Sequence, residues 1–305
     1  CAFLQAGEPE IKAVRVYPVP KRLEMLGGVS NAKIGDVRFF KAEGFGEEGY
    51  RIVAGRSFIA VEATTDAGFF YAKETLGQLA SGGDVPCCLV EDSPDVPLRG
   101  VVEGFYGRPW GTEGRYDLIE FMGRHKMNCF IYGPKDDDYH RGKWREDYPA
   151  DKAKMLSDLA ATAAKHKVRF VWAMHPGKDI QWTDADRAAS VAKLEKMYAL
   201  GIRAFSIFFD DINGAEQSKG DKQAEYLNYL TENFVNKHDD VAPLILCPTH
   251  YCKSYTGGND SYLRALGGAL DKKTHIMWTG AGVVDMINKS DMEWVNPRIS
   301  RNAYI

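Results

Sequence analysis

The sequence lacks the features that mark two large classes of protein. No apolar run approaches the roughly 20 residues that a membrane-spanning helix needs, so no transmembrane segment is expected. No long basic run is present either, and the formal net charge is −3. Because phosphate binding needs clustered Lys and Arg, this charge pattern argues against nucleic acid as a partner.

Cysteine is scarce, with six residues in 305 and no spacing that implies a disulfide framework or a metal motif. Cys129 and Cys247 stand inside apolar, strand-like runs, where a buried free thiol is expected. Cys1 leaves two interpretations open: the lipid-carrying first residue of a mature bacterial lipoprotein, or no more than the boundary of this sequence. The first interpretation predicts a lipid-anchored protein in the extracellular or periplasmic space.

Composition sets only broad limits. Hydrophobic residues make up 45% and charged residues 27%, which are ordinary values for a globular protein with a well-developed core. Aromatic residues make up 12%, and their faces suit sugar stacking and core packing equally well. The length allows one large domain or two smaller ones.

Residues 1–96 predict a small α+β domain. A strand is expected at Ile11–Tyr17, and the alternation around Ala54-Gly55-Arg56 predicts a hairpin of residues 50–53 and 57–62. Asp66 is expected to cap a helix over Ala67–Leu79. The stretch Pro86–Pro97, which contains three prolines, is interpreted as a linker.

Residues 97–305 alternate short apolar strands with amphipathic helices. This alternation predicts parallel strands joined by right-handed crossovers, and favours a (β/α)8 barrel over an open sheet. The eighth strand of that barrel has no counterpart in the sequence. The expected helices cover 113–126, 150–166, 183–199, 216–237 and 259–270, and the expected strands cover 98–105, 128–133, 168–174, 203–209, 243–248, 274–279 and 301–305.

In such a barrel the chemistry lies at the carboxyl ends of the strands. Carboxylates, aromatic residues and glycines are unusually dense at these predicted ends. The segments concerned are Glu103–Gly107, Tyr132–Asp138, His175–Gly177, Asp210–Asn213, Thr249–Tyr251 and Trp278–Gly280.

Five ordered motifs resemble glycoside hydrolase family 84, the O-GlcNAcase-like β-N-acetylglucosaminidases. They are RGVVEGFYGRPW at 99–110, YGPKDD at 132–137, FFDDI at 208–212, CPTHY at 247–251 and MWTG at 277–280. The resemblance covers about residues 95–305, and the leading unit is similar to the small domain that precedes the barrel in that family. It implies a hydrolase that removes terminal β-linked N-acetylglucosamine (GlcNAc) with retention, through an oxazoline intermediate.

Substrate-assisted enzymes of this kind use the sugar's 2-acetamido oxygen in place of a protein nucleophile. The resemblance implies that Asp210 orients and polarises the acetamide, while Asp211 acts first as general acid and then as general base. Two adjacent side chains in a strand point to opposite faces, so the pair must lie where the strand relaxes into a loop. Without the resemblance, an Asp-Asp pair after a strand more often caps the following helix.

The resemblance assigns six further residues to substrate binding. Tyr251 is expected to hydrogen-bond the oxazoline oxygen, and Lys135 to hold a ring hydroxyl together with the backbone of Gly104. Tyr106 matches a position in the pocket wall, where the glycines around it allow close approach of the backbone. Trp278 and Thr279 match the pocket for the acetamide methyl, although Trp278 fits a barrel core equally well.

No metal and no cofactor are expected. Asp136, Asp137, Asp138 and His140 form a carboxylate-rich loop, but such runs are usually solvated and show no closed ligand spacing. A Schiff-base role for Lys135 would need a lowered pKa, which neighbouring aspartates oppose.

Two other hypotheses remain beside the hydrolase. One is a weakly active or inactive GlcNAc-binding module, because the family continues beyond the seventh strand before its barrel closes. The other is a different substrate-assisted hexosaminidase or a chitinase-like barrel, which the Asp-Asp rather than Asp-Glu pair disfavours. The expected partners are GlcNAc-bearing glycans or glycoproteins, and the sequence does not distinguish between them.

Overall fold

The computed structural model describes residues 15–80, 83–212 and 214–305. The chain forms two compact units. The first comprises residues up to 100 together with 117–128 and 165–168, and the second comprises 101–116, 129–164 and 169–305. Cys1 lies outside the described residues, as does most of the strand predicted at Ile11–Tyr17, whose described end at 15–17 is not in a strand. The predicted domain boundary between 96 and 97 stays a prediction.

The first unit is built on a five-stranded sheet in the order β1-β5-β3-β4-β2. The predicted hairpin is confirmed, since Tyr50 pairs with Ala63 and Ala54 with Ile59 in antiparallel register. Inward residues of both hairpin strands are buried and alternate with partly exposed ones, so the sheet buries one face in the unit's core. The strands are β1 (Arg22–Val29), β2 (Arg38–Lys41), β3 (Tyr50–Ala54), β4 (Ile59–Ala63) and β5 (Pro86–Asp92).

The interpretation of Pro86–Pro97 as a linker is wrong for its first half. Residues Pro86–Asp92 form β5, which pairs antiparallel with both β1 and β3. Pro86 is the first residue of the strand, a position where the missing N–H is tolerated. The run from Cys87 to Val90 is buried or nearly so, and this apolar content outweighs the prolines that follow.

The predicted first helix is confirmed as α1 (Asp66–Leu79), but its cap is one residue earlier. The hydroxyl of Thr65 accepts hydrogen bonds from the backbone of Ala67 and Gly68, while Asp66 is the first helical residue. A short polar side chain at this position satisfies amides that have no partner inside the helix.

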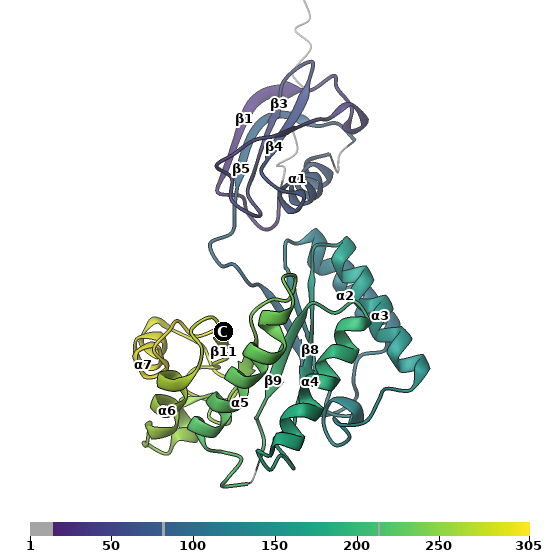
Figure 1. The fold of residues 1–305 in the computed structure, drawn as a ribbon. Coiled ribbons are helices and arrows are strands. Elements are labelled where there is room, and N and C mark those ends of the chain that lie inside the picture. The colour runs from purple at the N-terminus through teal and green to yellow at the C-terminus, as the bar shows by residue number, and fades with distance from the viewer. Residues whose placement is uncertain (1–14, 81–82, 213) are drawn as a thin grey trace, which may run out of the picture. The chain divides into compact units, whose positions relative to one another are not determined.

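The second unit is built on a curled six-stranded sheet in the order β6-β7-β8-β9-β10-β11 (Figure 1). Strands β7 to β11 pair in parallel, as the alternation of strands and helices predicted. Their residues are almost all buried, because helices flank a parallel sheet. The strands are β6 (Gly100–Glu103), β7 (Cys129–Tyr132), β8 (Arg169–Met174), β9 (Ala204–Phe208), β10 (Ile245–Cys247) and β11 (His275–Ile276).

The helices lie close to the predicted ranges, and α4 to α7 pack side by side in chain order (Figure 1). Thr183 caps α4 through its hydroxyl, as predicted. The helices are α2 (Thr112–Arg124), α3 (Ala150–Lys165), α4 (Asp184–Ala199), α5 (Gly220–Asn233), α6 (Ser261–Ala269) and α7 (Lys289–Ile299).

The expectation of seven full strands in the second unit is wrong at its end. The strand predicted at 301–305 is reduced to one parallel bridge between Met277 and Tyr304. Helix α7 precedes it and was not predicted, although Asn288 and Asp291 form a capping box at its start. The described sheet is therefore an open, curled α/β sheet rather than a complete barrel.

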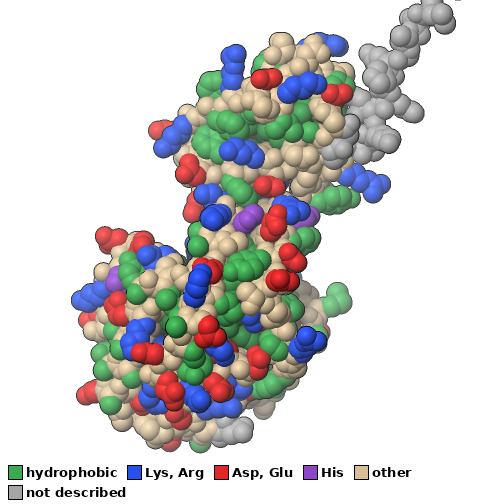
Figure 2. Space-filling view, turned by 90° about the vertical axis from the view of Figure 1, so that its right-hand side faces the viewer, with side chains coloured by type: hydrophobic (Ala, Val, Ile, Leu, Met, Phe, Trp, Pro, Cys, Tyr) green, Lys and Arg blue, Asp and Glu red, His purple; other side chains and the backbone are tan. Residues whose placement is uncertain are grey.

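Among the described residues, no helix is long and apolar enough to cross a membrane. The five described cysteines are free thiols, with Cys129 fully buried and Cys247 partly buried. Figure 2 shows acidic and basic side chains interspersed over the visible face, so neither sign dominates there.

Candidate active site

The two candidate catalytic carboxylates lie where β9 ends. Phe209 still bonds the backbone of Cys247 in the neighbouring strand, at 2.9 Å, and Asp210 and Asp211 follow directly. Asp211 has a φ of 52°, a left-handed conformation that takes the chain out of strand geometry. The pair therefore leaves the strict alternation of a strand, as the chemistry requires.

Lys135 lies between the two carboxylates. It follows Gly133 and Pro134 at the end of β7, and its Nζ contacts Asp210 Oδ2 and lies 3.6 Å from Asp211 Oδ2. The Lys135 side chain is buried, so its charge is weakly screened and offsets the repulsion between the two carboxylates. The structure thus brings three predicted site residues together from two strand ends.

The segment after β6 brings Tyr106 to the carboxylates and places Gly104 beside the end of β7. The Tyr106 hydroxyl donates a hydrogen bond to Asp211 Oδ2 at 2.9 Å. A Cβ added to Gly104 would lie 4.0 Å from the carbonyl oxygen of Gly133, so the ends of β6 and β7 approach closely. Tyr106 itself is 64% exposed, and its ring stands at the open side of the site.

Asp210 is far more enclosed than Asp211. Its residue is 9% exposed, and its Oδ1 atom is buried with no hydrogen-bond partner among the described residues. The buried His175 Nε2 lies 3.5 Å from this oxygen, so Oδ1 faces the interior of the fold rather than solvent. Asp211, whose side chain is 29% exposed, faces the open side of the site instead.

Two buried histidines support this region from within the fold. His175 follows β8, and its Nε2 donates to the backbone carbonyl of Asp210 at 2.8 Å, which requires a proton on that nitrogen. His140 bonds the carbonyl of Pro134 through Nε2 at 2.9 Å, one residue before Lys135. Burial lowers the pKa of His175, and lowers that of His140 to about 4, so both rings are neutral near pH 7.

Tyr251 and Thr279 come together beside a pocket. The Thr279 amide donates to the Tyr251 carbonyl at 2.9 Å, which joins the segments that follow β10 and β11. Burial raises the pKa of the Tyr251 hydroxyl, which therefore stays protonated and able to donate. Residues on either side of Tyr251 in the sequence, though not Tyr251 or Thr279, line a pocket of about 370 Å³ together with Asp211. Its lining residues are Asp211, Ile212, Ser218, Thr249, His250 and Tyr255.

Comparison with known proteins identifies this constellation. The sequence model of the β-N-acetylglucosaminidase family matches residues 99–305, which contain every candidate site residue. The chain belongs to that family. A second model, for domain 2 of glycosyl hydrolase family 20, matches residues 25–93 in the first unit.

Curated relatives of this glucosaminidase family include two mammalian enzymes. The chain is 34% identical over 217 residues to protein O-GlcNAcase of Mus musculus, and 33% identical to that of Rattus norvegicus. Each match covers 68% of this chain and 24% of the relative. The matched part thus corresponds to about a quarter of the length of these relatives.

Solved structures place the chain with glycoside hydrolase family 84, as its motifs implied. The structure of CpGH84B is 30% identical, with a TM-score of 0.89 over 96% of this chain and 61% of that one. CpGH84D is 25% identical, with a TM-score of 0.82. A mutant O-GlcNAc hydrolase of Thermobaculum terrenum is 31% identical over 68% of this chain and 46% of its own, with a TM-score of 0.63.

Trp278 is the predicted site residue that the structure places deepest. It is 2% exposed and stacks on Trp294 with ring centroids 5.7 Å apart. Its Nε1 atom has no hydrogen-bond partner among the described residues. The contact of Trp278 with the acetamide methyl, expected of this glucosaminidase family, stays a prediction.

The carboxylate-rich loop after β7 is engaged in structural contacts. Asp137 accepts hydrogen bonds from the hydroxyls of Tyr132 and Tyr148, at 2.9 and 2.8 Å, and from the backbone of Tyr139. Among the described residues, no group of three or more His, Cys, Asp or Glu side chains is arranged to hold a metal ion.

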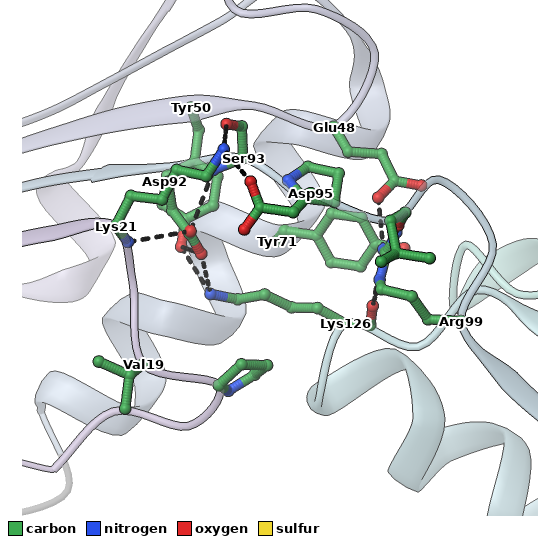
Figure 3. Close-up of a pocket in the computed structure, with 13 residues that line it drawn as sticks. Val19, Lys21, Glu48, Tyr50, Tyr71, Asp92, Ser93, Asp95, Arg99 and Lys126 are labelled. Atoms are coloured by element: carbon green, nitrogen blue, oxygen red, sulfur yellow. Dashed lines mark hydrogen bonds and ion pairs between the residues drawn. The ribbon is translucent and has the colours of Figure 1, made fainter. Parts of the chain in front are cut away.

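A second pocket, of about 380 Å³, belongs to the first unit (Figure 3). Its charged groups are already paired: Lys126 bonds Asp92 at 2.7 Å and the Tyr50 hydroxyl at 2.8 Å, and Lys21 pairs with Asp95 at 2.8 Å. These pairs compensate the charges of Lys126 and Lys21 within the first unit.

Two residues at the active site were not predicted as part of it. His175 stands in one of the predicted strand-end segments, but its contact with Asp210 is a backbone contact that no motif reveals. Arg141 lies in an irregular segment after the short 3₁₀ helix Asp138–His140, and its Nη2 is 3.4 Å from the Tyr106 hydroxyl. No sequence periodicity marks such a position.

Proposed function

We propose that this chain carries the catalytic centre of a β-N-acetylglucosaminidase that removes terminal β-linked GlcNAc from glycans or glycoproteins. The observation that carries the proposal is the Asp210-Asp211 pair, held with Lys135 and Tyr106 at the carboxyl ends of parallel strands. This is the end of the sheet at which (β/α) enzymes place their chemistry. The curled sheet is, in this proposal, part of a (β/α)8 barrel.

The proposed mechanism is substrate-assisted and retaining. Asp210 accepts a hydrogen bond from the acetamide N–H through its carboxylate, which Lys135 and His175 hold in place. This makes the acetamide oxygen more nucleophilic, and that oxygen attacks the anomeric carbon. The bond to the leaving oxygen breaks as Asp211 donates its proton to it, and an oxazoline forms.

The second step runs through the same two residues in reverse. Asp211, now a carboxylate, takes a proton from water as the water attacks the anomeric carbon and opens the oxazoline. The Tyr251 hydroxyl is the proposed donor to the oxazoline oxygen, and Lys135 together with the Gly104 backbone the proposed contacts to a ring hydroxyl. Thr279 and Trp278 are the proposed neighbours of the acetamide methyl.

The mechanism is tested with 4-nitrophenyl β-GlcNAc analogues whose acetyl methyl carries zero to three fluorines. Fluorine withdraws electrons from the acetamide oxygen, so kcat/KM should fall steeply across the series if this oxygen is the nucleophile. A protein nucleophile would make the series nearly flat, and a 2-fluoro sugar would then leave a covalent adduct visible by intact-protein mass spectrometry. Binding of a thiazoline analogue without any turnover would replace the hydrolase with a GlcNAc-binding module.

A further inference from the structure

Arg141 is a buried cation for which the mechanism above has no use. It is 8% exposed, and within the described part of the chain its guanidinium forms no salt bridge, while its Nε atom has no hydrogen-bond partner. Burying a charge is costly unless the charge is paired. Arg115 shows the usual solution, since it is equally buried but bonds both oxygens of Glu103 at 2.8 Å.

Two hydrogen bonds connect Arg141 to Asp211, the proposed acid. Its Nη2 donates to the Tyr106 hydroxyl at 3.4 Å, and that hydroxyl donates to Asp211 Oδ2 at 2.9 Å. The guanidinium carbon also lies 5.9 Å from the centroid of the Tyr106 ring. Tyr106 is mostly exposed, and Lys135 Nζ lies 5.3 Å from the centroid of its ring, but of these two cations Arg141 is the one that bonds its hydroxyl.

We propose that Arg141 is a positioning residue that acts on the acid through Tyr106. Arg141 fixes the Tyr106 hydroxyl, and the hydroxyl in turn fixes the Asp211 carboxyl in the direction of the leaving oxygen. The inference rests on the proposed function, because it takes Asp211 to be the acid.

Tyr106 and Arg141 also stabilise the negative charge that develops on Asp211 during the first step. Asp211 gives its proton to the leaving oxygen, the electron pair of the breaking bond goes to that oxygen, and a carboxylate remains. The Tyr106 O–H, polarised by the guanidinium, donates to this carboxylate. A preorganised donor aimed at developing charge is among the strongest means of lowering a barrier.

The test compares substrates that differ only in leaving group. Arg141→Gln should lower kcat/KM on the order of tenfold for a β-GlcNAc glycoside with a poor leaving group such as methoxyphenol, a loss equivalent to about 1.4 kcal/mol of barrier. For the 2,4-dinitrophenyl glycoside, which needs little protonation, the loss should be small. A substitution that merely loosened the fold would lower both rates alike.

Two variants control this comparison. Arg145→Gln removes a guanidinium four residues further along, one that pairs with Asp179 and Asp186, and should leave the ratio of the two rates unchanged. Arg141→Lys keeps the charge without the planar fork and should recover part of the ratio. If Arg141→Gln does not fold, the comparison of leaving groups is made with Arg141→Lys instead.

Tyr106→Phe, which keeps the ring and removes the hydroxyl, tests whether Arg141 acts on Asp211 through that hydroxyl. If Arg141 acts through that hydroxyl, Arg141→Gln should cost far less in the Tyr106→Phe background than in the unsubstituted chain. Additive losses, or equal losses on both leaving groups, would overturn the inference. Asp211→Asn in the same assay distinguishes a failure of the proposed function from a failure of this inference. If the loss in Asp211→Asn does not depend on the leaving group, both the proposed function and the inference fail. If that loss depends on the leaving group but the loss in Arg141→Gln does not, only the inference fails.

Discussion

At the scale of single residues, the two aspartates are neighbours in sequence but not in environment. Asp210 is enclosed and contacts Lys135 and His175, whereas Asp211 faces the open side and accepts from Tyr106. Enclosure suits a group that holds the acetamide, and openness suits a group that must reach a leaving oxygen of variable size. Different environments around paired carboxylates are how such enzymes divide their roles.

This division predicts different kinetics for the two Asn variants. Asp211→Asn removes the acid, so it should slow poor leaving groups by about 10²- to 10⁴-fold and good leaving groups much less. Asp210→Asn weakens formation of the oxazoline itself and should slow both kinds of substrate. The measurement is kcat/KM over a series of aryl β-GlcNAc glycosides, and equal losses across that series for Asp211→Asn would contradict its acid role.

At the scale of elements, the site depends on how closely β7 and β9 approach each other. A Cβ added to Gly133 would lie 2.8 Å from Cε2 of Phe208 and 3.2 Å from the Cβ of Ala173. Gly133 directly follows β7 and lies two residues before Lys135, so any separation here would move the lysine relative to the aspartates.

Gly133→Ala should therefore destabilise the protein by about 1–3 kcal/mol through overpacking, and lower activity with it. Urea unfolding measures the first effect and kcat/KM the second. Gly142→Ala is the matched control, because nothing lies within 4 Å of a Cβ added there. Equal unfolding midpoints for the two variants would show that the strand approach is not tight.

Elements with strong periodicity were the most predictable from sequence. The strands β7, β8 and β9 and helices α3 and α4 lie within a residue or two of their predicted bounds, because buried parallel strands and amphipathic helices leave clear patterns. Strand β1 was missed because most of its residues are exposed, so it has no clear apolar alternation. The strand predicted at 274–279 is shorter in the structure, because past Ile276 the described pairing is the single bridge between Met277 and Tyr304.

Only the site residues that belong to recognisable sequence motifs could be predicted. Asp210, Lys135 and Tyr106 stand in ordered motifs at strand ends, and the structure gives them mutual contacts. Arg141 depends on the path of an irregular loop, which local sequence does not determine. Its burial, with no charged partner among the described residues, is visible only once the fold is known.

At the scale of the whole molecule, the buried histidines link stability to pH. The pKa of His140 is about 4 in the folded state and near 6.5 when unfolded, and that of His175 is also lowered, in both cases chiefly by burial. Between pH 6.5 and about 4 the unfolded chain binds more protons at these sites than the folded protein does. The free energy of unfolding should therefore be highest above pH 6.5 and should fall as the pH falls through this window.

His140→Gln removes one of these groups and should flatten the dependence. Between pH 7 and pH 4.5 the variant should lose about 2 kcal/mol less unfolding free energy than the unsubstituted protein. Denaturant unfolding at the two pH values measures this difference. An identical pH dependence in the variant and the unsubstituted protein would contradict the assignment.

The left-handed backbone of Asp211 also determines which substitutions can be interpreted. Asn is one of the few residues that adopt this conformation readily, whereas Ala or a β-branched residue is strained there. An Asn variant at this position therefore changes the proton chemistry while preserving the path of the chain. An Ala or Val variant would alter both together, so a rate loss in it could not be attributed to the missing carboxyl, and libraries selected for altered activity at this position should be enriched in Asn and Gly.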